Sequence, residues 1–231
     1  MSTPVALITG AAGGIGAATA EVLREAGWRT AGLDLRPSPT DLPLLADVAD
    51  RRAVADAVDR AAGRFGRLDL VVTAAGYYED GIDVGDITTD QWNRMLAVAL
   101  GGTVNTCAAA LPHLLAAGTG TVVVISSELA LGGSTGDLHY VAAKGAVLGF
   151  AKSLALEVAD SGIRVNIVAP GPTDTPLLAP DSAWRDPAYL ATLPLGRLVT
   201  PAEVAYTVLH LATEGRMYCG DVLSPNAGAV I

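Results

Sequence analysis

The chain of 231 residues contains little cysteine and few basic residues, and each scarcity excludes a class of protein. Its two cysteines, Cys107 and Cys219, cannot build a disulfide framework, so we expect free thiols in a reducing cytoplasm. Neither has a His or Cys at metal-ligand spacing, and no metal site is expected. A net charge of −9, from 15 Lys and Arg against 24 Asp and Glu, argues against nucleic acid or an anionic membrane as a partner.

Long apolar runs are also lacking. No uninterrupted run approaches the ~20 residues that a membrane span requires. Residues 1–4 have no basic start followed by an apolar stretch, so no secretory signal is visible and a cytoplasmic protein is expected. With 51% hydrophobic residues, the chain is long enough for one sizeable core and short for two. We predict a single domain over residues 1–231.

Short apolar segments alternate with segments of helical periodicity along the chain. Strands are predicted at 5–8, 30–33, 68–73, 121–125, 163–168 and near Val222. Helices are predicted at 14–26, 50–63, 89–117, 140–159 and 201–212. This alternation predicts the α/β class: a Rossmann-like, doubly wound parallel sheet of about seven strands with helices on both faces.

Proline marks two segments as irregular. Residues 37–43 are expected to form a surface connection. Residues 172–199 carry five prolines and break the alternation of strands and helices. A long irregular segment inside a compact domain is usually a lid or a binding loop, so we expect this one to cover the substrate.

A glycine-rich turn over residues 9–16, with the sequence TGAAGGIG, joins the first strand to the first helix. Glycines there allow a tight turn and let the backbone approach a pyrophosphate at the positive helix N-terminus. Such a turn can also be purely structural, but Asp34 lies 18 residues past Gly16, where a carboxylate accepts hydrogen bonds from an adenosine ribose. The carboxylate repels a 2′-phosphate, which favours NAD over NADP. We interpret Arg36 as a solvated loop charge.

Tyr140 and Lys144 lie one turn apart on a predicted helix, and Ser127 ends a strand 13 residues before the tyrosine. A phenol is a poor acid or base at neutral pH because its unperturbed pKa is ~10. A nearby ammonium stabilises the phenolate and is expected to lower that pKa. Alone, the pair is also typical of an ordinary helix surface. Glu128 could meet a substrate hydroxyl or face solvent, and His139 could face the substrate.

The spacing Thr-Gly-x-x-x-Gly-Ile-Gly resembles the short-chain dehydrogenase/reductase family, and the resemblance continues over nearly the whole chain. Asp47-Val48 looks like the family's adenine-contacting pair, and residues 73–76 stand at the place of its Asn-Asn-Ala-Gly strand end. Residues 170–175 are similar to the Pro-Gly-x-x-x-Thr stretch that holds the nicotinamide carboxamide.

This resemblance implies that Ser127 binds the substrate oxygen, Tyr140 transfers the proton, and Lys144 stabilises the phenolate and binds the ribose. It implies cofactor contacts from Gly10, Gly14, Ile15, Gly16, Asp34, Asp47, Val48, Ala75, Gly76, Tyr140, Lys144, Pro170, Gly171, Thr173 and Thr175.

Three positions depart from the family pattern. Ala99 stands where a helix Asn is thought to hold a water behind the lysine, and Thr73 replaces the first Asn of the strand end. Residues 226–228, Asn-Ala-Gly, differ from the usual Asp-Gly-Gly. Because the Ser, Tyr and Lys are intact, we favour an active enzyme over a catalytically weak NAD-binding sensor.

The expected reaction is hydride transfer between NAD(H) and a secondary alcohol or ketone, with a small cyclic alcohol, ketone or dihydrodiol as the substrate. A 3-oxoacyl-type reductase is the alternative. The expected apolar wall of the substrate site consists of Trp184, Tyr189 and Leu193, with Tyr77 and Tyr78. The family implies a homotetramer or dimer formed through the long helices, including residues 95–115.

Overall fold

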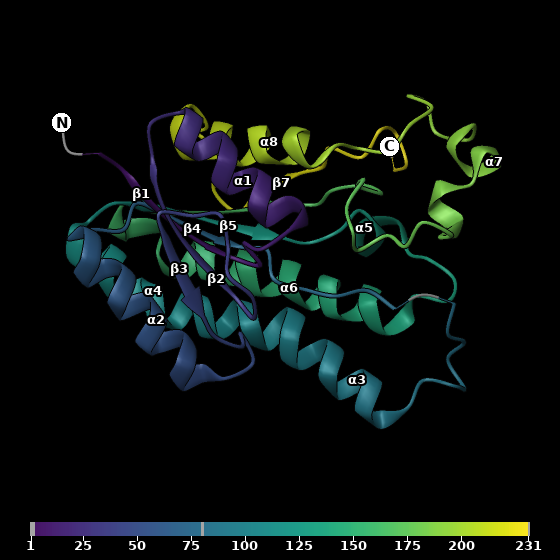
Figure 1. Cartoon of the computed structure of the whole chain (residues 1–231), viewed down its shortest axis with the longest axis horizontal. Coiled ribbons are helices and arrows are strands. Elements are labelled where there is room, and N and C mark those ends of the chain that lie inside the picture. Colours follow the sequence, from purple (N-terminus) through teal and green to yellow (C-terminus); the bar gives the residue numbers. More distant parts are fainter. Residues whose placement is uncertain (1–2, 80, 231) are drawn as a thin grey trace.

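A parallel sheet of seven strands forms the centre of the computed structural model, which describes residues 3–79 and 81–230 (Figure 1). The strands are β1 (Val5–Thr9), β2 (Arg29–Asp34), β3 (Leu42–Leu45), β4 (Leu70–Thr73), β5 (Gly120–Ile125), β6 (Ile163–Val168) and β7 (Val222–Leu223). Their order is β3-β2-β1-β4-β5-β6-β7, and each neighbouring pair is parallel. The order reverses between β1 and β4, where open parallel sheets bind ligands. The doubly wound prediction is confirmed.

Helices cover both faces of the sheet, with α1 and α8 on one side and α2, α4 and α6 on the other (Figure 1). The helices are α1 (Gly14–Glu25), α2 (Arg51–Phe65), α3 (Thr89–Leu96), α4 (Gly102–Ala117), α5 (Leu129–Gly132), α6 (Leu138–Glu157), α7 (Pro187–Leu190) and α8 (Pro201–Thr213). Local signals set several starts. Asp50 caps α2 through two backbone N–H groups, and Thr200 and Glu203 form a capping box at α8.

The strands contribute side chains to two separate hydrophobic cores, because successive side chains of a strand point to opposite faces of the sheet. In β1, Leu7 packs with the α2, α4 and α6 side, and its neighbour Ile8 packs with the α1 and α8 side. All five residues of β1 are buried, as expected for a strand covered by helices on both faces. The carboxyl end of β1 is thereby fixed between two layers, and the glycine turn begins there.

Strand β3 differs from the prediction, which assigned residues 37–43 to a surface connection. Leu42 pairs with Ala31, and the strand runs on to Leu45 at the edge of the sheet. Pro43 is tolerated because an edge strand leaves one row of N–H positions unpaired. Burial of Leu44 in the core stabilises this strand, and that burial depends on the neighbouring strand rather than on local sequence.

The helix predicted over residues 89–117 is interrupted. A π-helical segment, Ala97–Gly101, separates α3 from α4 and contains Ala99. Of the described residues, only the run Thr89–Ala117 is long and apolar enough to cross a membrane by length and composition. Its residues Cys107, Ala110 and Leu114 pack into the sheet core, so the run is part of the helical layer.

Residues 172–199 are irregular, as predicted, and contain a short 3₁₀ helix, Ala183–Arg185, and α7. Both ends of the segment are held together by a parallel bridge between Thr173 and Val199. Arg185 fixes the middle, because its guanidinium donates to the carbonyls of Leu178 and Thr175 and pairs with Asp174 at 2.8 Å. The segment lies over the carboxyl ends of the strands, beside the cavity described next.

Candidate active site

The glycine turn between β1 and α1 is shaped by close backbone contacts. Gly10 and Gly14 have φ of +69° and +52°, in the left-handed region that favours glycine. A Cβ on Gly16 would lie 2.2 Å from the Gly10 carbonyl oxygen, so only glycine fits there. The turn is therefore a tightly packed cradle at the N-terminus of α1, and Ile15 on the first turn of that helix lines the cavity described below. A helix N-terminus beside a cavity suits a pyrophosphate.

Asp34 at the end of β2 faces this turn. Its Oδ2 accepts a hydrogen bond from the Ala12 N–H at 3.0 Å, and its Oδ1 accepts one from the Arg36 N–H at 3.1 Å. The Arg36 side chain extends beside the turn, since its Nη2 would lie 3.8 Å from a Cβ on Gly13. Arg36 is thus exposed but close to the turn, and both charges bear on the choice of dinucleotide.

The expected adenine pair lies at the start of the segment leading into α2. Asp47 is exposed and its Oδ1 accepts from the Ala49 N–H at 2.9 Å. Val48 is buried against Gly102, where a Cβ would approach its Cγ2 to 2.7 Å, and its carbonyl accepts from Asn105 Nδ2. Helix α4 therefore fixes the backbone that presents Asp47 and Val48.

The end of β4 is held to β1 by one side chain. Thr9 Oγ1 accepts hydrogen bonds from the Ala74 and Ala75 N–H groups, both at 3.1 Å. Thr73 is buried, and its hydroxyl lies 3.5 Å from that of Thr103. Gly76 follows with its Cα facing Lys144, whose Nζ would lie 3.9 Å from an added Cβ. The structure thus brings the β4 end next to the catalytic lysine candidate.

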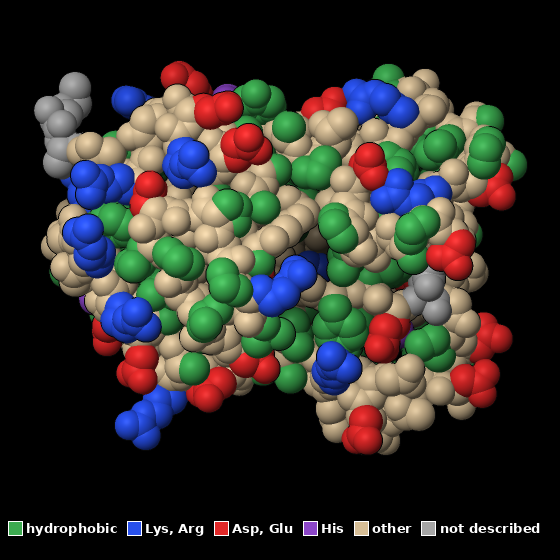
Figure 2. Space-filling view, in the orientation of Figure 1, with side chains coloured by type: hydrophobic (Ala, Val, Ile, Leu, Met, Phe, Trp, Pro, Cys, Tyr) green, Lys and Arg blue, Asp and Glu red, His purple; other side chains and the backbone are tan. Residues whose placement is uncertain are grey.

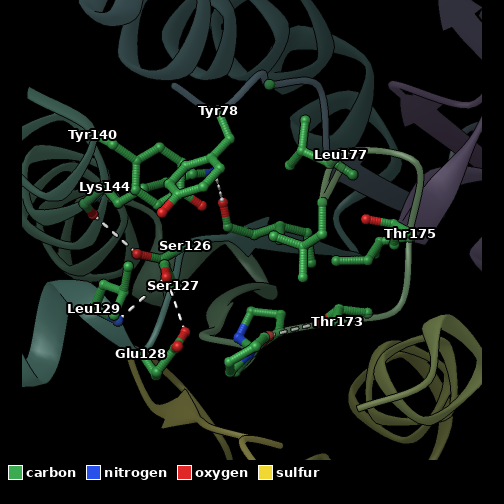
Figure 3. A pocket seen from close by; sticks show the side chains of 18 of the residues that line it. Tyr78, Ser126, Ser127, Glu128, Leu129, Tyr140, Lys144, Thr173, Thr175 and Leu177 are labelled. Atoms are coloured by element: carbon green, nitrogen blue, oxygen red, sulfur yellow. Dashed lines mark hydrogen bonds between the residues drawn. The ribbon is translucent and has the colours of Figure 1, made fainter. Parts of the chain in front are cut away.

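Residues after β6 form the wall of the cavity that faces Ser127, Tyr140 and Lys144 (Figure 3). Pro170 accepts from the Glu128 N–H at 3.0 Å, and Gly171 packs so closely on Asn226 that a Cβ would lie 2.6 Å from its Cα. The Thr173 hydroxyl donates to the Gly171 carbonyl at 2.7 Å. Thr175 is buried and approaches Gly14, which joins this wall to the glycine turn. The four residues of this stretch that were predicted to contact the cofactor all line the cavity, and Pro172 lines it as well.

The cavity holds the predicted catalytic residues on one side and the residues after β6 on the other (Figure 3). It encloses about 730 Å³ of space including its solvent-filled mouth. Figure 2 shows the surface hollowed on this face, with a Lys or Arg side chain beside the opening. Among the described residues, Lys144 is the sole Lys or Arg in the lining, and Glu128 the sole carboxylate. The other side chains that line the cavity are largely apolar or carry hydroxyl groups, which suits a small, mostly apolar substrate.

Ser127 reaches this cavity from the segment that follows β5, and Tyr140 and Lys144 reach it from α6. Ser127 is buried, and its hydroxyl donates to Glu128 Oε2 at 3.0 Å while accepting from the Leu129 N–H at 3.2 Å. Lys144 is buried and its Nζ donates to the Ile125 carbonyl at 2.9 Å. That ammonium lies 5.8 Å from the centroid of the Tyr140 ring. The three groups are close enough to act on one small molecule.

Electrostatics around Tyr140 differ from the expectation that Lys144 lowers its pKa. Enclosure of the hydroxyl raises the Tyr140 pKa above its ordinary value, and the Glu128 carboxylate raises it further, although a hydrogen bond with Ser127 lowers it. Burial also lowers the Lys144 pKa to about 8, so the ammonium itself is destabilised. In the protein alone, Tyr140 is therefore set up as a proton donor. Acting as a base requires additional positive charge nearby.

Tyr78 and Asp137 form a hydrogen-bonded link that sequence reasoning did not identify as a unit. The Tyr78 hydroxyl donates to buried Asp137 Oδ1 at 2.7 Å and accepts from Trp184 Nε1 at 2.8 Å. The Tyr78 ring also packs edge-on against Tyr140, with centroids 5.0 Å apart. The link therefore ties the segment 172–199 to the Tyr140 ring. Asp137 immediately precedes α6, but no local sequence signal distinguishes it from an ordinary helix-start residue.

Three of the five residues expected to form the substrate wall line the cavity: Trp184, Tyr77 and Tyr78. Tyr189 instead packs edge-on against Trp184, with centroids 4.9 Å apart, and so supports the wall from behind. Leu193 is wrongly placed by the prediction, since it is buried in the core on the α1 and α8 side. His139 also points elsewhere: its side chain is fully buried with Nε2 3.6 Å from Glu79 Oε2.

Glu128 gives a stability prediction that needs no substrate. Burial raises its pKa from 4.5 to about 7, so the folded protein binds this proton more tightly than the unfolded chain does. The free energy of unfolding contributed by Glu128 therefore falls as pH rises through that interval, by on the order of 3 kcal/mol. Glu128→Gln should remove this fall. Denaturant unfolding of both proteins at pH 4.5 and pH 7 measures it; equal pH dependence in the two would contradict it.

The chain is similar in sequence and in fold to known dehydrogenases and reductases. A family profile described as short chain dehydrogenase matches residues 4–186. The chain is 38% identical to cis-4-hydroxycyclohexanecarboxylate dehydrogenase of Sinomonas cyclohexanicum, covering 97% of this chain and 95% of the relative. It is 33% identical to a 3-oxoacyl-(acyl-carrier-protein) reductase of Thermotoga maritima, covering 98% of each. A 3-ketoacyl-(acyl-carrier-protein) reductase from Brucella melitensis, solved with NADH, superposes with a TM-score of 0.93 at 25% identity, covering 100% and 99%.

Proposed function

Because the chain belongs to the short-chain dehydrogenase family, and is thus an oxidoreductase acting on an alcohol or ketone, we propose that it transfers a hydride between NAD(H) and a small cyclic secondary alcohol, ketone or dihydrodiol. The observation that carries this proposal is the convergence of Ser127, Tyr140 and Lys144 on one largely apolar cavity. The cyclic substrate is supported by the similarity to a dehydrogenase of a hydroxylated cyclohexane.

The residues present fit a dinucleotide. The cradle at Gly10 and Gly16 has no room for a Cβ, and Asp34 sits at its edge. We assign the pyrophosphate to residues 10–16, the adenosine to Asp34, Asp47 and Val48, and the nicotinamide riboside to the remaining predicted contacts: Ala75, Gly76, Tyr140, Lys144, Pro170, Gly171, Thr173 and Thr175. When bound, the nicotinamide ring supplies the hydride acceptor.

The protein's part in the reaction is to position the substrate and move one proton. Oxidation converts a secondary alcohol and NAD⁺ into a ketone, NADH and a proton. Ser127 orients the substrate oxygen, and Tyr140 takes the hydroxyl proton as the C–H bond breaks; reduction of a ketone runs the same step in reverse. Lys144 holds positive charge beside the phenolate that forms. Such proton transfer contributes about 10²–10⁴-fold to rate.

Two alternatives remain open to test. A 3-oxoacyl-type reductase is favoured by the similarity to the Thermotoga and Brucella reductases. A catalytically weak NAD-binding sensor is favoured by Ala99, which is 3% exposed and packs beside Met95 and Ala143 where the family pattern has an amide. We further propose a cytoplasmic homotetramer or dimer formed through α4 and α6, and a lid role for residues 172–199.

The proposal is tested by following NADH formation from NAD⁺ with a panel of cyclic secondary alcohols, and the consumption of NADH and of NADPH with a 3-oxoacyl thioester. Turnover of ring alcohols well above that of the thioester supports the proposal. Faster turnover of the thioester favours the reductase. Tight NAD binding with no turnover of any compound in the panel favours the sensor.

Cofactor preference is a separate expectation: NAD⁺ should bind at least about tenfold more tightly than NADP⁺, a difference of ~1.4 kcal/mol. The reason is that Asp34 meets the 2′-position, although Arg36 beside the turn partly offsets its charge. Asp34→Asn should lower the ratio of NAD⁺ affinity to NADP⁺ affinity, and Arg36→Ala should raise it. Calorimetric titration with both dinucleotides measures the two effects, and equal affinities in the native protein would show that Arg36 acts as a phosphate ligand.

A further inference from the structure

Glu128 is a carboxyl group inside the cavity that the proposed reaction does not use. It is 3% exposed, although its side chain lines the cavity next to Ser127 (Figure 3). Carboxyl groups are rarely buried this completely without a partner, because loss of hydration is costly. Its main side-chain partner is the Ser127 hydroxyl at 3.0 Å, with further hydrogen bonding from the backbone of residues 128 and 129.

The hydrogen bond to Glu128 uses the hydroxyl of Ser127, which is the group proposed to bind the substrate oxygen. A serine hydroxyl has a single proton to donate, and in this structure Ser127 donates it to Glu128 Oε2. The Leu129 N–H meanwhile donates to the Ser127 oxygen. For Ser127 to donate to the reacting oxygen of a substrate, Glu128 must accept a hydrogen bond from another donor in place of Ser127, or lose its side-chain hydrogen bond.

Building on the proposed function, we infer that Glu128 binds a second hydroxyl of the substrate, on the carbon next to the reacting one, so that the preferred substrates are neutral vicinal diols and α-hydroxy ketones. Ser127 Oγ and Glu128 Oε2 lie 3.0 Å apart, close to the separation of oxygens on adjacent ring carbons. One substrate oxygen can then meet Ser127 and Tyr140 while its neighbour donates to Glu128. The substrate itself frees the Ser127 proton.

Charge in the cavity argues that the substrate is neutral. Within the described part of the chain, Lys144 is the sole Lys or Arg of the lining, and its Nζ is bonded to the Ile125 carbonyl. Arg185 on the neighbouring segment is committed to Asp174 and to backbone carbonyls. A substrate carboxylate would thus lie in the same cavity as Glu128 without a cation of its own, which is unfavourable in a cavity of low polarity.

The test compares kcat/KM with NAD⁺ for three ring compounds: cis-1,2-cyclohexanediol, cyclohexanol and cis-4-hydroxycyclohexanecarboxylate. Above the raised pKa of Glu128, where its carboxylate is ionised, the native protein should prefer the diol to cyclohexanol by tenfold or more, as expected for one hydrogen bond to a charged group. It should turn over the carboxylate less well than the diol. Glu128→Val should lose most of the diol preference, chiefly through KM, and Glu128→Gln should lose part of it because the amide still accepts.

Glu157→Gln, an exposed change at the end of α6, is the matched control and should keep the native ratio. NAD⁺ affinity and melting temperature establish that each variant is folded; if Glu128→Val does not fold, the ratio in Glu128→Gln decides. A diol-to-cyclohexanol ratio that is near one, or that is unchanged in the Glu128 variants, overturns this inference and leaves the proposed function standing. A native protein that prefers cis-4-hydroxycyclohexanecarboxylate to the diol also overturns this inference. Absence of NADH formation with every ring alcohol overturns the proposed function instead.

Discussion

Replacing Tyr140 with Phe should lower turnover by about 10²–10⁴-fold, the contribution of a positioned proton donor or acceptor. The change deletes one hydroxyl in the cavity and leaves the ring that packs edge-on against Tyr78 at 5.0 Å. The fold and NAD⁺ affinity should therefore be retained. Steady-state kcat, melting temperature and NAD⁺ titration on the same preparation separate loss of chemistry from loss of structure.

Tyr206→Phe supplies the control for Tyr140→Phe, because Tyr206 is exposed on α8 and its hydroxyl takes no part in the cavity. It should turn over substrate at the native rate. Native turnover in Tyr140→Phe would show that another group moves the proton. His139 is excluded from that role by its burial against Glu79, and Glu128, already in the cavity, becomes the first alternative.

Gly16→Ala should be the most damaging single-methyl change in the cofactor cradle. The added Cβ would lie 2.2 Å from the Gly10 carbonyl oxygen, and the backbone fixes the positions of both atoms, so neither can move independently of β1 and α1. Overpacking of this kind costs about 1–3 kcal/mol or more. If the turn opens to relieve it, NAD⁺ affinity should fall by about 10²-fold. Titration of the variant with NAD⁺ and thermal unfolding with and without NAD⁺ measure the two effects.

Gly13→Ala, three residues earlier in the same turn, is the matched control. A Cβ there meets nothing nearer than Arg36 Nη2 at 3.8 Å, an ordinary contact. Its φ of −171° is extended backbone that any residue adopts. Gly13→Ala should consequently keep most of the native stability and affinity. If the two alanine variants lose affinity equally, steric closure at Gly16 is not what shapes the cradle.

Much of the fold was predictable because its signals are local. The alternation of apolar strands with helical periodicity predicts the parallel sheet, and its β6 strand lies where the sequence places it, at Ile163–Val168. Strand β3 was not predictable, because Leu42–Leu45 becomes a strand only by pairing with β2 at the edge. The π-helical segment Ala97–Gly101 within the long helix was likewise not predicted, and no local sequence signal distinguishes it from the helix on either side.

The candidate site shows the same division. The glycine turn and the Tyr-x-x-x-Lys spacing carry their chemistry in a few neighbouring residues, so sequence predicts them. The link from Trp184 through Tyr78 to Asp137 joins residues 106 and 59 positions apart, and only the folded chain brings them together. The raised pKa of Tyr140 in the protein alone could not be predicted from the Tyr-x-x-x-Lys spacing, because it depends on burial of the hydroxyl and on the Glu128 carboxylate.

In the proposed reaction a hydride passes directly from the carbinol carbon of a ring alcohol to NAD⁺. The most direct measurement uses cyclohexanol or cis-1,2-cyclohexanediol deuterated at the carbinol carbons, in ordinary water, with mass analysis of the reduced cofactor. We expect NADH that carries one deuterium from the substrate and forms more slowly than with the undeuterated alcohol. Reduced cofactor that contains no deuterium, or NAD⁺ bound and left unreduced by either alcohol, would contradict it.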